Sequence, residues 1–446
     1  MTGLVTLGLT AGSFAQDEAE RKPLFGETHI HTAYSFDAYL FNTRATPDDA
    51  YNFGKGKPLK HPLGTTHQLK RPLDFMAVTD HGFFMGSMMK MSDQSHRLSK
   101  HPLAAIVNNA DPRVRSTAFQ AVITGQIDGQ PADMAALADL GVQQDTWERV
   151  IESANRHNDP GTFTTLIGYE WTSTPNGQNM HRNVIFKGDS APLPFTRIDS
   201  ENPEDLWMWM DEIRADGFES LAIPHNTNKS DGLMFERATS DGSPFTEEYA
   251  ARRNRNEPLV EVTQIKGTSE THPILSPNDE FADFEIDGSY VAGPTKITKF
   301  AGSYVRDAYR TGLEFQDTDG FNPYRFGLVG STDSHTGIVT VTEKVYSGKA
   351  GNFDGTPEAR INMSRRAMDS GASGLAGVWA EENTRDSIYE ALRRKETWGT
   401  TGPRIKVRFF GGFDMKDVTP GDKDWVEAAY SNGVSMGGEL KGSRKS

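Results

Sequence analysis

The sequence predicts an α/β fold in which strands and helices alternate around a parallel sheet. Short apolar segments, typical of buried strands, are separated by segments with apolar residues at helical spacing. Each apolar segment also ends in polar side chains, and barrel enzymes build their sites at the carboxyl ends of strands. A barrel is therefore favoured over an open sheet. The 446 residues fit two or three domains, or one large domain with insertions.

Five segments are expected to form buried strands, because each is short, apolar and bounded by polar residues. They cover residues 73–79, 165–168, 220–224, 258–263 and 326–330. The polar residues that follow them are Asp80-His81, Tyr169-Glu170, His225-Asn226, Gln264 and Ser331 to His335. Since the carboxyl ends of parallel strands share one end of a sheet, these polar residues are expected to lie close together.

Helices are expected between these strands. The letters TPDD at residues 46–49 supply an N-cap, a first-turn proline and first-turn acids. Apolar residues recur at helical spacing over 145–157, in a segment that opens at Asn202, and over 384–395. Trp207 lies on the apolar side of the segment after Asn202, so we expect it to pack in the core.

Three regions are expected along the chain. They are a signal peptide or disordered N-terminus at 1–22, the barrel at 23–404 with an insertion at about 82–144, and a C-terminal β extension and tail at 405–446. The run from Leu4 to Ala15 is apolar and ends in a small-x-small pattern, so a periplasmic or secreted protein is expected. A strand is expected at 405–410. No later apolar run reaches the ~18 residues that cross a membrane.

The composition restricts the chemistry. The chain has no cysteine, so any metal must be held by His, Asp or Glu. The formal net charge of −14 argues against nucleic-acid binding, which needs a basic surface. Neither a G-x-S-x-G nucleophile turn nor a Walker A phosphate loop is present. Water activated by metal is therefore the better candidate nucleophile.

Half of the twelve histidines stand in or beside the segments with polar ends. They are His29, His31, His81, His181, His225 and His335, and Asp37, Asp80, Glu170 and Asp333 accompany them. A single histidine at a strand end is usually a packed or surface residue. Imidazoles and carboxylates at so many strand ends, however, form the donor set that divalent metal ions prefer. The pattern therefore predicts a metal site.

The order of these motifs resembles that of a known superfamily. The motifs are HIH (29–31), SFD (35–37), TDH (79–81), GYE (168–170), MHR (180–182), PHN (224–226) and TDSH (332–335), and they resemble the PHP (polymerase and histidinol phosphatase) superfamily. The longer stretches GETHIHTAYSFDAY, RPLDFMAVTDH, IGYEWTS, HRNVIF and GSTDSHTG are similar to its DUF3604 family, over about residues 24–410. The resemblance implies a distorted (βα)7 TIM-like barrel with a helical insertion and extra C-terminal β structure.

The resemblance also implies a centre with three metal positions. Two or three divalent ions, Zn, Mn or Fe, would be bound there. Nine ligands follow from it: His29, His31, Glu170 and Asp333 for a first ion, His181 and His225 with the bridging Glu170 for a second, and Asp37, His81 and His335 for a third. Asp37 stands where many members of the superfamily have histidine. Asp80 is expected to orient a histidine or the bridging water, as carboxylates behind metal ligands do.

Hydrolysis of a small anionic phosphoester by a metal-bridged hydroxide is the activity that the resemblance implies. Arg182 is a candidate clamp for a phosphoryl oxygen, with a structural ion pair as the alternative. His272 is a candidate proton donor, with a plain loop histidine as the alternative. Hydrolysis of sulfate or phosphonate esters stays open, since the same site would serve. A non-catalytic metal-binding accessory protein is the alternative of a different class.

Overall fold

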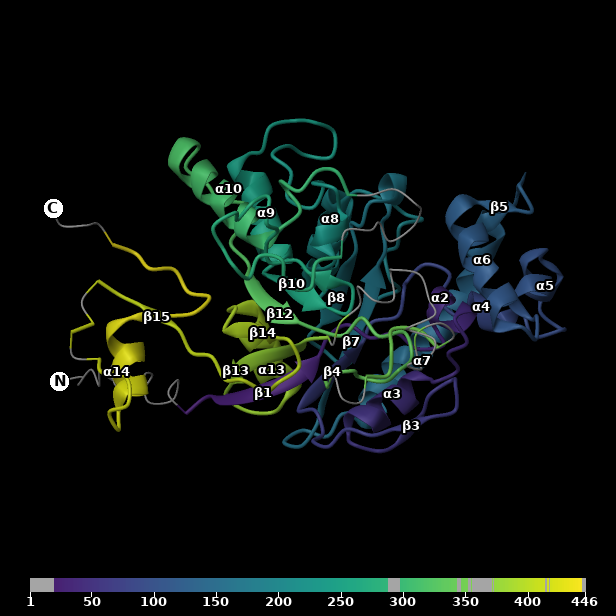
Figure 1. The fold of residues 1–446 in the computed structure, drawn as a ribbon, viewed down its shortest axis with the longest axis horizontal. Helices are drawn as coiled ribbons and strands as arrows, with labels where there is room; N and C mark the ends of the chain where they lie inside the picture. Colours follow the sequence, from purple (N-terminus) through teal and green to yellow (C-terminus); the bar gives the residue numbers. More distant parts are fainter. Residues whose placement is uncertain are drawn as a thin grey trace, which may run out of the picture.

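The fold is built on a curled, mixed sheet of seven strands, described from a computed structural model (Figure 1). The structure describes residues 20–442, apart from 288–296, 343–345, 352–353, 355–370, 372, 414 and 417. The expected signal peptide at 1–22 thus lies almost wholly outside the described residues. In order across the sheet, the strands are β14 (Thr397–Thr400), β13 (Leu375–Ala380), β1 (Lys22–Glu27), β4 (Phe75–Val78), β7 (Thr164–Trp171), β8 (Arg182–Phe186) and β9 (Ser220–Pro224).

The expectation of a parallel sheet is correct for the centre of this sheet and wrong at its sides. β1, β4 and β7 run parallel, whereas β8 runs antiparallel to β7 and β13 runs antiparallel to β1. The connection from β7 to β8 contains only the short turn η3 (Pro175–Gly177), and a parallel return would need a longer crossover. The start of β8 therefore lies at the carboxyl end of β7.

A second sheet of three strands lies against both edges of the first. Its strands are β11 (Gly267–Thr268), β10 (Leu259–Gln264) and β12 (Gly327–Gly330), and β10 and β12 are parallel. β10 contacts β9, and β12 contacts β14, so the two edge strands of the large sheet approach the same small sheet. All five expected strand segments contain a strand of these two sheets, and the sheet curls into a half-barrel.

Helices pack around the sheet and beside it (Figure 1). They are α2 (Phe36–Leu40), α3 (Pro47–Gly54), α7 (Leu140–His157), α8 (Pro203–Ala215), α9 (Glu247–Asn256), α10 (Val305–Thr318) and α13 (Arg385–Arg393). Thr46 and Asp49 form a capping box at the start of α3, as the TPDD stretch predicts. Trp207 in α8 is fully buried, which confirms its packing role. Within the described part of the chain, each helix is too short or too polar to span a bilayer.

The insertion forms a small helical lobe beside α7, at the right of Figure 1. It contains α4 (Ser87–Lys90), η1 (Arg97–Lys100), α5 (Leu103–Val107), α6 (Pro112–Thr124), β5 (Gln126–Ile127), β6 (Gln130–Pro131) and η2 (Met134–Leu137). Its apolar side chains, among them Leu98, Leu103 and Leu137, form a separate hydrophobic cluster with α2. A further hairpin, β2 (Leu59–Lys60) and β3 (Thr66–His67), lies in the loop before β4.

The C-terminal region departs from the expected strand at 405–410. Only Phe410 of that segment is in a strand. It begins β15 (Phe410–Gly411), which pairs with β16 (Val434–Ser435), and α14 (Trp425–Asn432) lies between these two strands in the sequence. The indole N–H groups of Trp379 and Trp398 donate to the carbonyls of Val407 and Ile405. Side chains of the large sheet thus take the carbonyls that a strand ladder would use.

Candidate metal centre

The nine side chains predicted as metal ligands lie together at one end of the curled sheet. All nine are buried: His29, His31, Asp37, His81, Glu170, His181, His225, Asp333 and His335. Isolated bridges from Ile30 to Ser334 and from His81 to Glu170 hold the strand ends beside each other. Because β8 runs antiparallel to β7, its first residues lie at this end of the sheet. His181 directly precedes β8, so it lies there too.

Three groups of these residues have the geometry of ion sites. In each group, one donor atom per residue lies within 4.8 Å of the others. The groups are His31, Asp37, His81 and His335; His29, Glu170 and His225; and His29, His31 and Asp333. His29 and His31 each belong to two groups, so neighbouring ions could be held close together.

Several distances between donor atoms match those around an ion better than those of hydrogen bonds, whereas His181 and His335 lie at hydrogen-bond distance, 2.6 and 2.8 Å, from Glu170 and Asp37. Two atoms that each bind a tetrahedral ion at about 2.0–2.1 Å are roughly 3.3–3.4 Å apart. Nε2 of His29 and Nε2 of His31 each lie 3.4 Å from Oδ1 of Asp333. Nε2 of His81 lies 3.4 Å from Oδ1 of Asp37. Ordinary hydrogen bonds between nitrogen and oxygen have a mode near 2.9 Å.

Several of these donor atoms also lack a hydrogen-bond partner. They are Nε2 of His29, Nε2 of His31, both ring nitrogens of His225 and Oδ1 of Asp333, and all are buried. Buried polar atoms are nearly always paired, because an unpaired one loses its hydration without compensation. Unpaired atoms that converge on one place therefore fit a metal ion as their partner.

Glu170, on strand β7, lies between the groups. Its Oε2 is 3.2 Å from Nε2 of His31 and 3.5 Å from Nε2 of His29. Its Oε1 is 2.6 Å from Nδ1 of His181 and 3.5 Å from Nε2 of His225. One carboxylate thus faces histidines from both sides, which is the arrangement that a bridging ligand requires.

Asp80 lies behind the cluster and orders the turn after β1. Its carboxylate accepts hydrogen bonds from the N–H and O–H of Thr32, both at 2.6 Å, and from the O–H of Ser35 at 2.8 Å. The Ser35 oxygen lies 2.8 Å from Nδ1 of His31. When Nδ1–H of His31 donates to Ser35, its Nε2 lone pair is directed at the cluster.

Two buried glutamates behind His29 were not predicted. Oε2 of Glu261 lies 2.9 Å from Nδ1 of His29, and Oε1 of Glu27 accepts the backbone N–H of His29 at 2.8 Å. Burial raises the pKa of Glu27 to about 8 and that of Glu261 well above its ordinary value. Glu27 alternates with His29 and His31, and Glu261 is the lone charge in an apolar strand, so both had a signal in the sequence.

Among the residues described, the cluster carries six buried acids but only two lysines. The acids are Glu27, Asp37, Asp80, Glu170, Glu261 and Asp333, and the bases besides histidine are Lys266 and Lys349. Lys266 pairs with Asp333, and Nζ of Lys349 lies 2.9 Å from Nδ1 of His335. Burial lowers the pKa of Lys349 to about 8. Such an excess of buried carboxylates fits bound divalent cations.

Arg182, the predicted phosphoryl clamp, and His272, the predicted proton donor, make their contacts with residues outside the set of nine. Arg182 follows His181 on the strand, so its side chain points to the opposite face. Its Nε donates to Glu257 at 2.8 Å, which is the position that the alternative of a structural ion pair describes. His272 stacks on Phe300 with 4.1 Å between ring centroids, and only burial lowers its pKa. These contacts are those of a loop histidine rather than of a proton donor at the cluster.

Comparison with known proteins identifies the family. Residues 18–446 match the family described as protein of unknown function (DUF3604), so the chain belongs to this family, as its motifs predict. Among solved structures, it is similar to a two-domain protein from Bacteroides vulgatus that contains a predicted PHP-like metal-dependent phosphoesterase. That match has 13% identity and a TM-score of 0.37, and covers 89% of this chain and 73% of the other. No curated protein matches.

Proposed function

We propose that this protein is a metal-dependent hydrolase that cleaves phosphoesters in a PHP-type, distorted barrel. The observation that carries the proposal is the set of buried, unpartnered imidazole and carboxylate atoms, spaced 3.4 Å apart around Asp333. Buried polar atoms are rarely left without a partner in a folded protein, and a bound metal ion would be the partner of these atoms. The donor set suits Zn, Mn or Fe ions.

The proposed ligand sets are those that the resemblance implies, and they overlap the three groups; His181 lies outside those groups but contacts Glu170. We propose one ion on His29, His31, Glu170 and Asp333, a second on Glu170, His181 and His225, and a third on Asp37, His81 and His335. Glu170 would bridge the first two, since its two oxygens face different histidines. Bound ions of this kind polarise phosphoryl oxygens and lower the pKa of a bound water.

The protein's own residues would prepare the site for a small anionic ester. Lys266 and Lys349 place two ammonium groups beside Asp333, where they would attract a phosphoryl group. Asp80, acting through Ser35, would keep His31 in one orientation. The apolar run at residues 4–15 supports a periplasmic or secreted location as part of this proposal.

Metal analysis of the purified protein, combined with chromogenic phosphate mono-, di- and triesters and sulfate and phosphonate esters, tests the proposal. At least two ions per chain and turnover of a phosphoester are expected. Fewer than two ions per chain and no turnover of any ester would refute the proposal that the protein is a metal-dependent enzyme. Turnover confined to sulfate or phosphonate esters would support a hydrolase but would contradict phosphoesters as its substrates.

A further inference from the structure

The two oxygens of the Asp333 carboxylate have different surroundings. Oδ1 is buried, has no hydrogen-bond partner among the described residues, and lies 3.4 Å from Nε2 of His29 and from Nε2 of His31. Oδ2 is contacted by three donors, which are the side chains of Gln264, Asn226 and Lys266. The protein thus holds one oxygen of Asp333 and leaves the other available to a metal ion.

The amide of Gln264, the last residue of β10, has one orientation that satisfies all its contacts. Its Oε1 accepts the backbone N–H of Lys266 at 2.5 Å, so Nε2 is the atom that faces Asp333, at 2.9 Å from Oδ2. The same Nε2 donates to Oδ1 of Asn226, whose Nδ2 lies 3.4 Å from Oδ2 of Asp333. These hydrogen bonds assign the oxygen and nitrogen of both amides, and both amides present N–H groups to Asp333.

The backbone brings Asn226 and Asp333 together in an uncommon conformation. Asn226 directly follows the predicted ligand His225, and Asn226 and Asp333 have φ values of 49° and 53°. This left-handed region is rare outside glycine, and asparagine and aspartate enter it more often than most residues. Such strain persists where surrounding contacts fix it, and it is common at functional sites. Asn226 and Gln264 are also buried, so their contacts with Asp333 are shielded from water.

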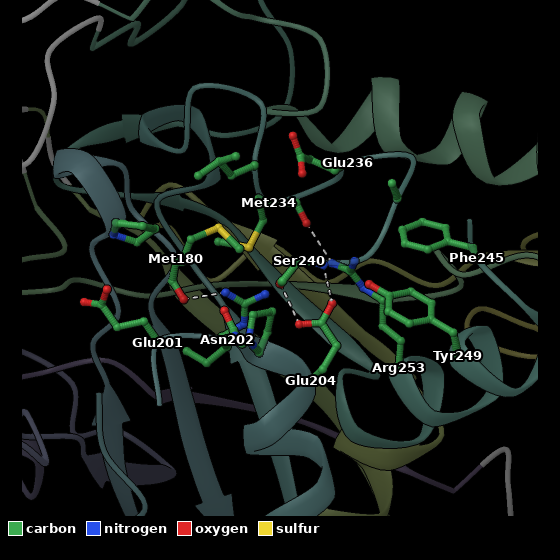
Figure 2. Close-up of a pocket in the computed structure, with 15 residues that line it drawn as sticks. Met180, Glu201, Asn202, Glu204, Met234, Glu236, Ser240, Phe245, Tyr249 and Arg253 are labelled. Carbon is green, nitrogen blue, oxygen red and sulfur yellow. Dashed lines mark hydrogen bonds between the residues drawn. The ribbon is translucent and has the colours of Figure 1, made fainter. Parts of the chain in front are cut away.

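A buried carboxylate outside the cluster is arranged differently. Glu257 pairs with Arg182 and Arg253, two arginines that line a cavity of about 220 Å³ beside the start of β8 (Figure 2). Its Oε1 accepts from Nε of Arg182 at 2.8 Å and from the indole N–H of Trp207 at 2.9 Å. Its Oε2 lies 3.3 Å from Nε of Arg253. Both oxygens of Glu257 are therefore paired, whereas only one oxygen of Asp333 is.

We propose that Gln264 and Asn226 are positioning residues that make Asp333 a metal ligand through Oδ1 alone. This role rests on the proposed function, because it takes Asp333 to be a ligand. Carboxylates bind metal ions through one oxygen or through both, and the second mode takes two coordination positions. Donors on Oδ2 favour the first mode, since partners behind a ligand fix its orientation. A coordination position is then kept for water or substrate, as catalytic metal sites require.

Gln264→Met tests this role, since methionine is similar in size to glutamine and has no side-chain N–H group. Competition with a chromogenic chelator should show metal binding weakened by about 10–100-fold, the usual effect of losing such a partner. Asp333 would also be free to bind through both oxygens. The variant loaded with Co²⁺ should therefore absorb visible light more weakly per bound ion, because Co²⁺ absorbs less as its coordination number rises. Unchanged affinity, or an unchanged Co²⁺ spectrum, in the folded variant would overturn the proposal.

Asn226→Gly keeps the test decisive if Gln264→Met does not fold. Glycine adopts the left-handed conformation of residue 226 without strain, and the contact of Gln264 with the N–H of Lys266 is retained. Affinity and Co²⁺ absorption should change in the same direction as in Gln264→Met, and unchanged values would refute the role of Asn226. Gln120→Met, an exposed change on α6, is the control and should bind metal like the wild type.

The wild-type protein separates this inference from the proposed function. A wild type that binds no ion would refute the proposed function and this inference with it. A wild type that binds its ions, together with variants of unchanged affinity and spectrum, would refute only the positioning roles of Gln264 and Asn226.

Discussion

The ring of His29 and the carboxylate of Glu261 form a fully buried pair, with 2.9 Å between Nδ1 and Oε2. A proton on Nδ1 that is donated to this carboxylate leaves Nε2 of His29 free to bind metal. The carboxylate also increases the basicity of that nitrogen. Glu261 therefore orients a candidate ligand without being one.

Glu261→Gln should weaken metal binding by about 10–100-fold, the usual effect of losing such a carboxylate. Competition with a chromogenic chelator measures the change. Glu148→Gln, on the exposed side of α7, is the matched control and should leave the affinity unchanged. Wild-type affinity in Glu261→Gln would show that the contact with His29 has no role in metal binding.

His81→Ala should remove the ion proposed on Asp37, His81 and His335, because that group loses one of its two imidazoles. Metal content should fall by up to one ion per chain, and phosphoester turnover should fall with it. Circular dichroism checks that the fold is intact, and His96→Ala in the insertion is the control. Full metal content and full turnover would make the third ion dispensable.

Asp80→Asn should destabilise the protein by about 1.5–3 kcal/mol, since charge-assisted hydrogen bonds from Thr32 and Ser35 are lost or weakened. Urea denaturation measures this cost. Asp145→Asn, an exposed change on α7, should have almost no effect. Equal stability of Asp80→Asn and wild type would contradict the ordering role of Asp80.

Removal of metal should lower the stability of the whole fold. An ion present at 100 times its dissociation constant stabilises a protein by about 2.7 kcal/mol. Thermal unfolding should therefore shift to lower temperature in EDTA and recover when Zn, Mn or Fe is restored. An unfolding curve that is insensitive to chelator in a protein shown to lose its metal would contradict coupling between metal and fold.

Glu257→Gln should destabilise the protein by about 3–5 kcal/mol near neutral pH, because it leaves two buried arginines without a carboxylate. Burial raises the pKa of Glu257, but Arg182 and Arg253 lower it further, so the net shift is below the ordinary value of 4.5.

The stabilisation from ionised Glu257 is therefore present above pH 4.5 and lost as the pH falls through the lowered folded pKa. Urea unfolding across this range should show the difference between variant and wild type narrowing in acid. A difference that is constant with pH would mean that Glu257 is not ionised in the folded protein.

The candidate site was more predictable than the sheet. The strand ends at His81, Glu170 and His225 were visible because each polar residue follows an apolar segment. The direction of a strand leaves no such local mark, so the antiparallel β8 was missed. The expected strand at 405–410 failed for a tertiary reason, since indoles of distant tryptophans bind its carbonyls.

Within the site, the sequence was least informative about residues brought in by long loops. Lys349 lies in no motif, and its contact with His335 depends on the path of the chain after β12. Arg182 was assigned a role through its neighbour His181, although adjacent residues of a strand face opposite sides. The two belong to different surroundings, one to the cluster and one to the cavity.

The candidate metal centre also constrains the order in which the chain can mature. The N–H of Asp333 donates to the carbonyl of His29 at 2.7 Å, which joins segments about three hundred residues apart. During synthesis, β1 leaves the ribosome long before β12, and contacts of such separation form late. A nascent chain therefore holds its first histidines without Asp333 or His335, and loading of the complete centre waits until synthesis has passed β12.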